Sequence, residues 1–275
     1  MKAMKMSVSP RTLALYEKSG REFSEFRFDR GLSAVWPIPI DHIMEYCVSL
    51  HRRGLATGTI RGKLAGLSFA AKVNGWPDST SDVRIRRMLE GWARSTQVKG
   101  DDRKPITPDL LVGLNQQWMA LCFSEFEQLL FHATALVTFF GAFRISEVLA
   151  QSKNDKSHAA LLFSDVHLHE EQVNFYLRRS KTDQKGRGAQ IALAKAPIAE
   201  ICPVLAMANF LAARGGRPGY LFSHSDGLPL TKYQFWAVAK KALSALGFVG
   251  CKFGTHSFRI GAATCLLYTS DAADD

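Results

Sequence analysis

The segment LVTFFGAFRISEVLA, residues 136–150, constrains the fold more than any other part of the sequence. It is apolar all round except for Arg144, Ser146 and Glu147, so a helix formed here must be buried on every side. The spacing predicts one helix that begins at Ser124 and runs through this segment to Gln151. Because burying an unpaired charge costs free energy, Arg144 must have an ion-pair partner or a functional role. Two interpretations remain open, an i,i+3 ion pair with Glu147 and a functional role.

Basic residues are concentrated in the first hundred positions. Residues 1–100 contain 17 Lys and Arg against 9 Asp and Glu, and the whole chain has a formal net charge of +10. A solvated basic surface is the ordinary interpretation, and an excess so concentrated also points to a polyanionic partner such as nucleic acid. The polar segment QVKGDDRKPITPD follows, with Gly100, Pro105 and Pro108, and predicts a linker between the basic part and the nearly neutral remainder.

Four helices are predicted between residues 10 and 96, from apolar residues at helical spacing. Ser9 is expected to cap the first, Thr57 or Thr59 the third, and Ser81 the fourth. Five cations lie on the last two of these helices. Surface solvation is the ordinary explanation for such charges, and a surface that tracks DNA phosphates is the functional one. The candidate DNA-binding residues are Arg61, Lys72, Arg84, Arg87 and Arg94.

The remainder of the chain mixes helices with a hairpin. Helices are expected to begin at Pro108 and at Ser124, and EQVNFYLRRS and AQIALA read as two strands joined by the polar loop KTDQKGRG. Helices resume near Pro203, a short strand and turn lie in GYLFSHSDGLPLT, and KYQFWAVAKKALSALG is amphipathic. Thr255 is expected to cap the last helix, HSFRIGAATCLL.

Several classes of protein are excluded by what the sequence does not contain. The five cysteines form no CxxC pair and no cluster with histidine at zinc spacing, which favours reduced intracellular thiols and no metal site. There is no apolar run long enough to span a membrane, and the first residues lack the apolar stretch of a signal peptide. A GxxxxGK[ST] phosphate loop is also missing. We therefore expect a soluble protein of the cytoplasm or nucleus.

Three motifs are weak alone and specific in order. Arg144 lies in AFRISEVL, Lys181 in RRSKTDQKGRGAQIAL, and His256 and Arg259 in THSFRIGAAT, where they share one face of a helix. This series of Arg, Lys and His-x-x-Arg resembles the tyrosine recombinases of the phage integrase superfamily. The connector RKPITPDLL and the four-helix N-terminal region also match, so the resemblance covers the chain to about Thr264.

The resemblance implies a mainly α fold with a small β-sheet, of the α+β class. A helical, SAM-like core-binding domain is expected at residues 1–99, a linker at 100–108, and a mixed α/β integrase-type catalytic domain at 109–265. The two domains would together clamp double-stranded DNA, the partner that the resemblance implies, and a homo-oligomer on DNA is compatible with it. The implied activity is DNA recombination and integration by strand cleavage and rejoining.

The implied roles agree with the chemistry of the side chains. Arg144 and Arg259 can hold the non-bridging oxygens of one phosphate and stabilise the crowded transition state. Lys181 is the candidate general acid for the leaving 5′ oxygen, and His256 can bond the phosphate or shuttle a proton. Glu147 would orient Arg144. No metal and no cofactor is needed, because the cations are side chains and a phosphotyrosine link conserves the phosphodiester energy.

The nucleophile is the part of the resemblance that this sequence does not match. Only Tyr268 follows Arg259, nine residues later. On one helix that separation turns the chain by about 180° and advances it roughly 13 Å, so Tyr268 is rejected as the nucleophile. The last ten residues, LLYTSDAADD at 266–275, are predicted to be a non-native tail on an incomplete catalytic domain.

Three functions remain after this mismatch. The first is a recombinase that cleaves and rejoins DNA in its complete form. The second is a catalytically inactive DNA-binding fragment that lacks the tyrosine. The third is a helical interaction protein, which the joint presence of Arg144, Lys181, His256 and Arg259 disfavours.

Overall fold

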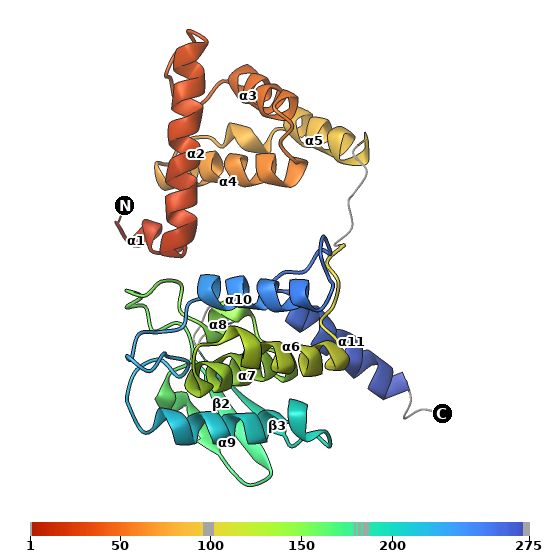
Figure 1. Cartoon of the computed structure of the whole chain (residues 1–275). Helices are drawn as coiled ribbons and strands as arrows, with labels where there is room; N and C mark the ends of the chain where they lie inside the picture. Colours follow the sequence, from red (N-terminus) through yellow and green to blue (C-terminus); the bar gives the residue numbers. More distant parts are fainter. Residues whose placement is uncertain (1, 96–101, 179, 181–182, 184–186, 272–275) are drawn as a thin grey trace. The chain divides into compact units, whose positions relative to one another are not determined.

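The computed structural model describes residues 2–95, 102–178, 180, 183 and 187–271, and for residues 2 and 266–271 it describes the backbone alone. The chain divides into two compact units, residues 1–100 and 101–275 (Figure 1). The boundary falls within the predicted linker. No helix in the described ranges is both long and apolar enough to cross a bilayer.

Unit 1 contains four principal helices, as the sequence predicts for residues 10–96 (Figure 1). Ser9 caps the first of them, because its hydroxyl accepts the Thr12 N–H at 3.1 Å. Their apolar faces enclose one core that includes Phe23, Ile43 and Leu89. The elements are α1 (Lys2–Lys5), α2 (Pro10–Asp29), α3 (Ile40–Arg52), α4 (Thr57–Val73), the 3-10 turn η1 (Ser79–Ser81) and α5 (Val83–Ser95).

Two predicted helix caps in unit 1 are wrong. The N-cap position of α4 is occupied by Ala56, with no side-chain bond, so neither Thr57 nor Thr59 caps that helix. Ser81 belongs to η1, and the Arg84 N–H donates instead to the Asp82 carboxylate at 2.8 Å. A carboxylate at this place also complements the helix dipole, which explains why Asp82 serves at the start of α5.

Unit 2 is a helical body with one small sheet, so the predicted class is confirmed. Helices begin where Pro108 and Ser124 were expected to start them, and the Ser124 hydroxyl accepts the Glu127 N–H at 3.2 Å. The elements are α6 (Pro108–Leu121), α7 (Glu125–Phe140), α8 (Ile145–Val148), η2 (Phe163–Asp165), β1 (Val166–Leu168), β2 (Gln172–Leu177), β3 (Ala189–Ala194), η3 (Ala199–Ile201), α9 (Pro203–Arg214), α10 (Lys232–Ala245) and α11 (Ser257–Asp271).

The sheet is antiparallel in the order β1-β2-β3, and β2 and β3 form the predicted hairpin. Alternate residues of β2, namely Val173, Phe175 and Leu177, are buried, and α9 packs against the strands (Figure 1). The strand β1 was not predicted, because three residues are too few to show an alternating pattern.

Helix α7 is the centre of unit 2 and is buried on nearly every side from Leu130 to Phe139. Helices α6, α8, α9 and α11 all contact it. Its two buried hydroxyls, on Thr134 and Thr138, each donate to the carbonyl four residues earlier at 2.7 Å. Both hydroxyls are therefore satisfied within the helix itself, which allows them to lie in an apolar core.

The predicted helix from Ser124 to Gln151 is interrupted. Helix α7 ends at Phe140, Ala142 has a φ of 46°, and the Phe143 N–H donates to the Thr138 carbonyl at 3.1 Å, which is a Schellman-type end. A Cβ at Gly141 would lie 2.2 Å from the Phe143 ring, so the turn needs a glycine there. Arg144 consequently lies just after a turn, at the N-cap of α8, and not on a central helix.

The chain segment before α6 is hydrogen-bonded to the segment before α11. The Lys104 N–H donates to the Lys252 carbonyl at 2.8 Å, and the Ile106 N–H donates to the Ser257 carbonyl at 3.0 Å. Helix α11 begins at Ser257, so His256 and not Thr255 precedes its first residue. The helix continues to Asp271, through residues 266–271 of the predicted tail.

Gly261 is required by this contact, because a Cβ there would lie 1.8 Å from the Ile106 carbonyl oxygen. We expect Gly261→Ala to lower the free energy of unfolding by about 2 kcal/mol or more, since backbone cannot move aside as a side chain can. Chemical denaturation measures the change. Gly216→Ala is the matched control, because a Cβ at Gly216 would have no atom within 4 Å. Equal effects of the two substitutions would contradict the prediction.

Candidate functional site

Arg144 is held by Glu147, which is 7% exposed. The guanidinium NH1 donates to Oε1 of Glu147 at 2.9 Å, and the Arg144 backbone N–H donates to Oε2 at 2.8 Å. The i,i+3 ion pair anticipated from the sequence is therefore present, although it spans the start of α8. Both carboxylate oxygens bond one residue, which fixes the direction of the guanidinium. The contact is the one expected of an orienting residue, and that role stays a prediction.

The N-terminus of α10 lies beside the end of α8. Ala150 and Thr231 form a parallel bridge, and the Lys232 N–H donates to the Ala150 carbonyl at 3.2 Å. The Thr231 hydroxyl accepts the Gln234 N–H at 3.3 Å, and the Gln234 side chain accepts the Thr231 N–H at 3.0 Å, forming a capping box. The backbone donors of Lys232 and Gln234 are thus occupied, and Lys232 begins the helix at a fixed place.

A pocket of about 310 Å³ forms where these segments meet. Its walls come from the connector before α6, the turn between α7 and α8, the start of α10 and the turn before α11. Three of its side chains carry permanent positive charge, one is a histidine, and two are hydroxyls, whereas no acidic residue of the described ranges lines it. Such a set of donors suits a phosphate. The lining residues are Arg103, Phe143, Arg144, Ile145, Ser146, Lys232, Thr255 and His256.

Two of the four predicted catalytic residues, Arg144 and His256, are brought together in this pocket. Arg259 lies one helical turn beyond His256 in α11, is half-buried, and does not line the pocket. Lys181 lies outside the described residues. The catalytic roles assigned to these residues stay predictions.

The hairpin that carries Lys181 is anchored near both of its strand ends. Arg178 follows β2, and its Nε donates to Oδ1 of the buried Asp165 at 2.9 Å. On the other side, the Gly188 N–H donates to Oδ2 of Asp183 at 2.8 Å. These bonds restrict where the ends of the loop lie.

Arg103 and Lys232 are pocket residues that the sequence did not reveal. Arg103 was assigned to a polar linker, and Lys232 to the start of an amphipathic segment. Only their long-range neighbours distinguish them from solvated charges. A basic residue at the first position of a capped helix was the sole local signal, and it is a common one.

The five cations predicted to track DNA differ in their partners within unit 1. Lys72 pairs with Asp78 at 3.3 Å, Arg84 with Asp82 at 3.0 Å, and Arg87 with Glu90 at 3.1 Å. Arg61 and Arg94 are exposed and form no ion pair with any described residue. The carboxylates partly neutralise the first three, so Arg61 and Arg94 offer the stronger local field.

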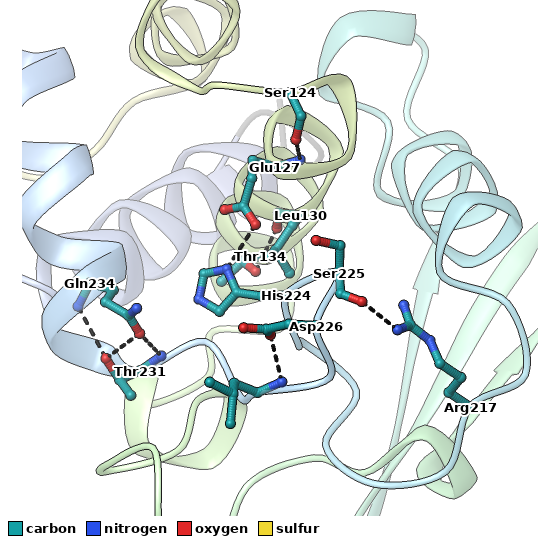
Figure 2. Close-up of polar contacts among 11 residues, drawn as sticks. Ser124, Glu127, Leu130, Thr134, Arg217, His224, Ser225, Asp226, Thr231 and Gln234 are labelled. Atoms are coloured by element: carbon teal, nitrogen blue, oxygen red, sulfur yellow. Dashed lines mark hydrogen bonds and ion pairs between the residues drawn. The ribbon is translucent and has the colours of Figure 1, made fainter.

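A half-buried ion pair fastens the loop that precedes α10 to the start of α7. Nδ1 of His224 lies 2.8 Å from Oε1 of Glu127, and Figure 2 shows the imidazole facing that carboxylate, beside Thr231 and Gln234 of the capping box. The hydrogen bond to Glu127 raises the pKa of His224, against the opposing effect of burial. Since only a few residues separate His224 from Lys232, this pair helps to hold the pocket wall.

Within the described ranges, no group of three His, Cys, Asp or Glu residues could hold a metal ion.

Comparisons with known proteins agree with this architecture. No protein-family model matches the sequence. An integrase/recombinase xerD homolog of Selenomonas ruminantium is 26% identical over 272 residues, which cover 95% of this chain and 75% of that protein. The solved XerH site-specific recombinase, in its post-cleavage complex with palindromic difH substrate, superposes with a TM-score of 0.63 at 16% identity, over 92% of this chain and 68% of that chain.

A second solved structure supports the same fold. The Tn1549 transposon integrase, in complex with transposon right-end DNA, has a TM-score of 0.61 at 15% identity, over 95% of this chain and 82% of that chain. The chain has the tyrosine recombinase fold, and the resemblance that its motifs predict is confirmed.

The His224–Glu127 pair predicts a pH-dependent stability. Because the pKa of His224 is raised above its unfolded value of about 6.5, the pair stabilises the fold fully below that pH, and the contribution is lost as pH rises through the folded pKa. We expect His224→Gln to lower the free energy of unfolding by about 1 kcal/mol at pH 6, and by less at pH 9. Denaturation at both pH values measures this. The exposed His169→Gln is the control, and a pH-independent loss in His224→Gln would contradict the prediction.

Proposed function

We propose that this chain binds duplex DNA and holds a backbone phosphate in the pocket bounded by Arg144 and His256. The site would be the phosphate-binding part of a centre for site-specific DNA strand cleavage and rejoining. One observation carries the proposal: basic side chains from four separate segments line one pocket, and no acidic side chain of the described residues lines it. A phosphodiester is the anion that such an arrangement, on this fold, would meet.

The electrostatics of the pocket favour a phosphate over a neutral ligand. Arg144 keeps its charge at every physiological pH, and its geometry is fixed before the ligand arrives, because Glu147 bonds it. Preorganised donors need no reorganisation when charge develops on the phosphoryl oxygens. The Ser146 and Thr255 hydroxyls can donate to the same oxygens.

The proposed chemistry assigns the remaining roles as the resemblance implies. A tyrosine oxygen would replace the 5′ oxygen on phosphorus and pass its proton to His256, and the departing 5′ oxygen would take a proton from Lys181. One phosphoester bond forms as another breaks, so no nucleotide is consumed. Arg259 would hold the phosphate together with Arg144, and His256 would bond a phosphate oxygen. A homo-oligomer on DNA, and a location in the cytoplasm or nucleus where DNA is found, belong to this proposal.

Tyr268 does not suit the nucleophilic role in this chain. Helix α11 is continuous from Ser257 to Asp271, so Arg259 and Tyr268 are nine residues apart on one helix. Their Cα positions are then on opposite sides of the helix axis and roughly 13 Å apart along it. For residues 1–275 taken alone, this observation favours a second candidate function, which is to bind DNA without cleaving it.

Salt-dependent binding tests the DNA proposal. We expect the chain to bind a short duplex at low salt, with an affinity that falls steeply as salt rises, because bound phosphates release counterions. Replacing the two cations without ion pairs, in Arg61→Gln/Arg94→Gln, should reduce the slope of log K against log salt by about 2, at roughly 0.9 per phosphate contact. Fluorescence anisotropy measures both quantities.

The control for that experiment is Arg86→Gln, an exposed residue paired with Glu90 and outside the predicted DNA-binding set. Its slope should equal that of the unmodified chain. If the unmodified chain does not bind at low salt, the proposed function is wrong.

Covalent trapping separates the two candidate functions. We expect the 275-residue chain to form no protein–DNA adduct with a nicked suicide duplex, since the helical repeat places the Cα of Tyr268 across the axis of α11 from that of Arg259. Denaturing electrophoresis detects an adduct as a slower band. A band that appears with the unmodified chain and disappears in Tyr268→Phe would overturn this expectation and establish cleavage.

A further inference from the structure

Two basic residues of the pocket have no role in the proposed chemistry. Arg103 and Lys232 line the same pocket as Arg144 and His256, but they come from the connector before α6 and from the start of α10. We infer that Arg103 and Lys232 are phosphate-binding residues that contact the DNA backbone at this site, beyond the single phosphate held by Arg144. This inference rests on the proposed function and adds two residues to its binding surface.

Charge and volume support the inference. One phosphodiester carries a single negative charge, whereas Arg103, Arg144 and Lys232 together bring three permanent positive charges to the pocket. The pocket, at about 310 Å³, has roughly ten times the volume of one water molecule in the liquid. It therefore has room for a phosphate with its attached sugars. Glu147 bonds Arg144 without lining the pocket, so no carboxylate of the described residues lies in the pocket to compete with phosphate for these cations.

Lys232 has no competing carboxylate among the described residues. Other lysines of unit 2 do, since Lys195 pairs with Glu171 at 2.6 Å and Lys252 pairs with Asp102. The position of Lys232 is nevertheless set by its backbone, through the Ala150 carbonyl and the Thr231 cap. A fixed Cα, together with an ammonium group that has no carboxylate partner among the described residues, is expected of an anion-binding residue.

Two backbone donors at the start of α10 already have partners. The Lys232 N–H donates to Ala150, and the Gln234 N–H donates to the Thr231 hydroxyl. The contact that we infer is therefore made by the Lys232 side chain and not by these two N–H groups.

Arg103 is placed by long-range backbone pairing. The residues next to it in the connector bond to Lys252 and Ser257, and its Cδ lies 3.6 Å from the position of a Cβ on Gly254. The arginine stem thus crosses the turn that carries Thr255 and His256. Because the turn and the connector are hydrogen-bonded together, Arg103 and His256 line one pocket in the absence of DNA.

Contacts to phosphate make a specific prediction about salt. The full chain and a short random-sequence duplex are used, with Arg103→Gln, Lys232→Gln and Lys232→Arg. We expect each glutamine variant to reduce the slope of log K against log salt by about 0.9, and Lys232→Arg to keep the slope of the unmodified chain. The loss should be the same on A·T-rich and G·C-rich duplexes, because phosphates carry no base sequence.

The matched control is Lys241→Gln, which removes an exposed lysine of the same helix. Lys241 follows Lys232 by nine residues, so it lies on the opposite side of α10, and it does not line the pocket. Its slope should be unchanged. Thermal unfolding of each variant, compared with the unmodified chain, verifies that the exposed substitutions leave the fold intact.

The outcomes separate this inference from the proposed function. If Arg103→Gln and Lys232→Gln keep the full slope while Arg61→Gln/Arg94→Gln reduces it, DNA binding stands and the inference is wrong. If the unmodified chain does not bind the duplex at all, the proposed function is wrong, and so is the inference that rests on it. A loss of binding confined to one duplex composition would assign the two residues to bases, and would also overturn the inference.

A second measurement tests the pocket without DNA. Inorganic phosphate is titrated into the full chain at low ionic strength, and the ring signals of His256 are followed by NMR. We expect saturable shifts, with the apparent Kd at least fivefold higher in Arg103→Gln and Lys232→Gln, and unchanged in Lys241→Gln. Equal phosphate affinities in all four proteins would contradict the inference.

Discussion

Burial of α7 on nearly every side is the constraint on which unit 2 depends. A helix without a solvent face must be covered by several others, and α6, α8, α9 and α11 all meet it. The core that results includes Leu130, Leu136 and Phe139, which are almost fully removed from water. Because protein interiors pack at crystal-like density, a helix so enclosed cannot shift without moving its neighbours. The turn at its C-terminal end, and hence Arg144, is positioned as rigidly as the core.

The acidic residues near the pocket are arranged so that its positive charge remains available. Glu147 is bonded to Arg144 through both oxygens, and Asp102 pairs with Lys252 beside the connector. Each carboxylate fixes a basic segment in place without lining the pocket itself. Carboxylates that faced the pocket would weaken anion binding. Glu147 and Asp102 instead hold the basic segments that form its walls. This division of roles between anchoring and binding charges explains how several cations can be held near one another.

Local sequence patterns predicted most of the helices and strands. The features that they did not predict depend on contacts between side chains or on segments far apart in the sequence. Apolar spacing located α7 and the β2–β3 hairpin, and the i,i+3 spacing of Arg144 and Glu147 anticipated their pair. The turn at Gly141 was missed, because it depends on the ring of Phe143 and on an alanine with positive φ, which no local rule favours. Arg103 could not be recognised, since its neighbours in space are about 150 residues away in the chain. Of the predicted catalytic residues, Arg144 and His256 meet in the pocket, whereas the roles of Lys181 and Arg259 rest on the motifs.

The pocket is assembled from segments that range from Arg103 to His256, and this has a thermodynamic consequence. A site built from such distant parts exists only when the whole of unit 2 has folded, since no single helix or hairpin carries it. Any anion that binds there binds the native state alone, and its binding energy is added to the stability of the entire unit. Folding and ligand affinity are therefore linked. A substitution that destabilises the core far from the pocket would lower the apparent affinity for DNA once the unfolded fraction becomes appreciable.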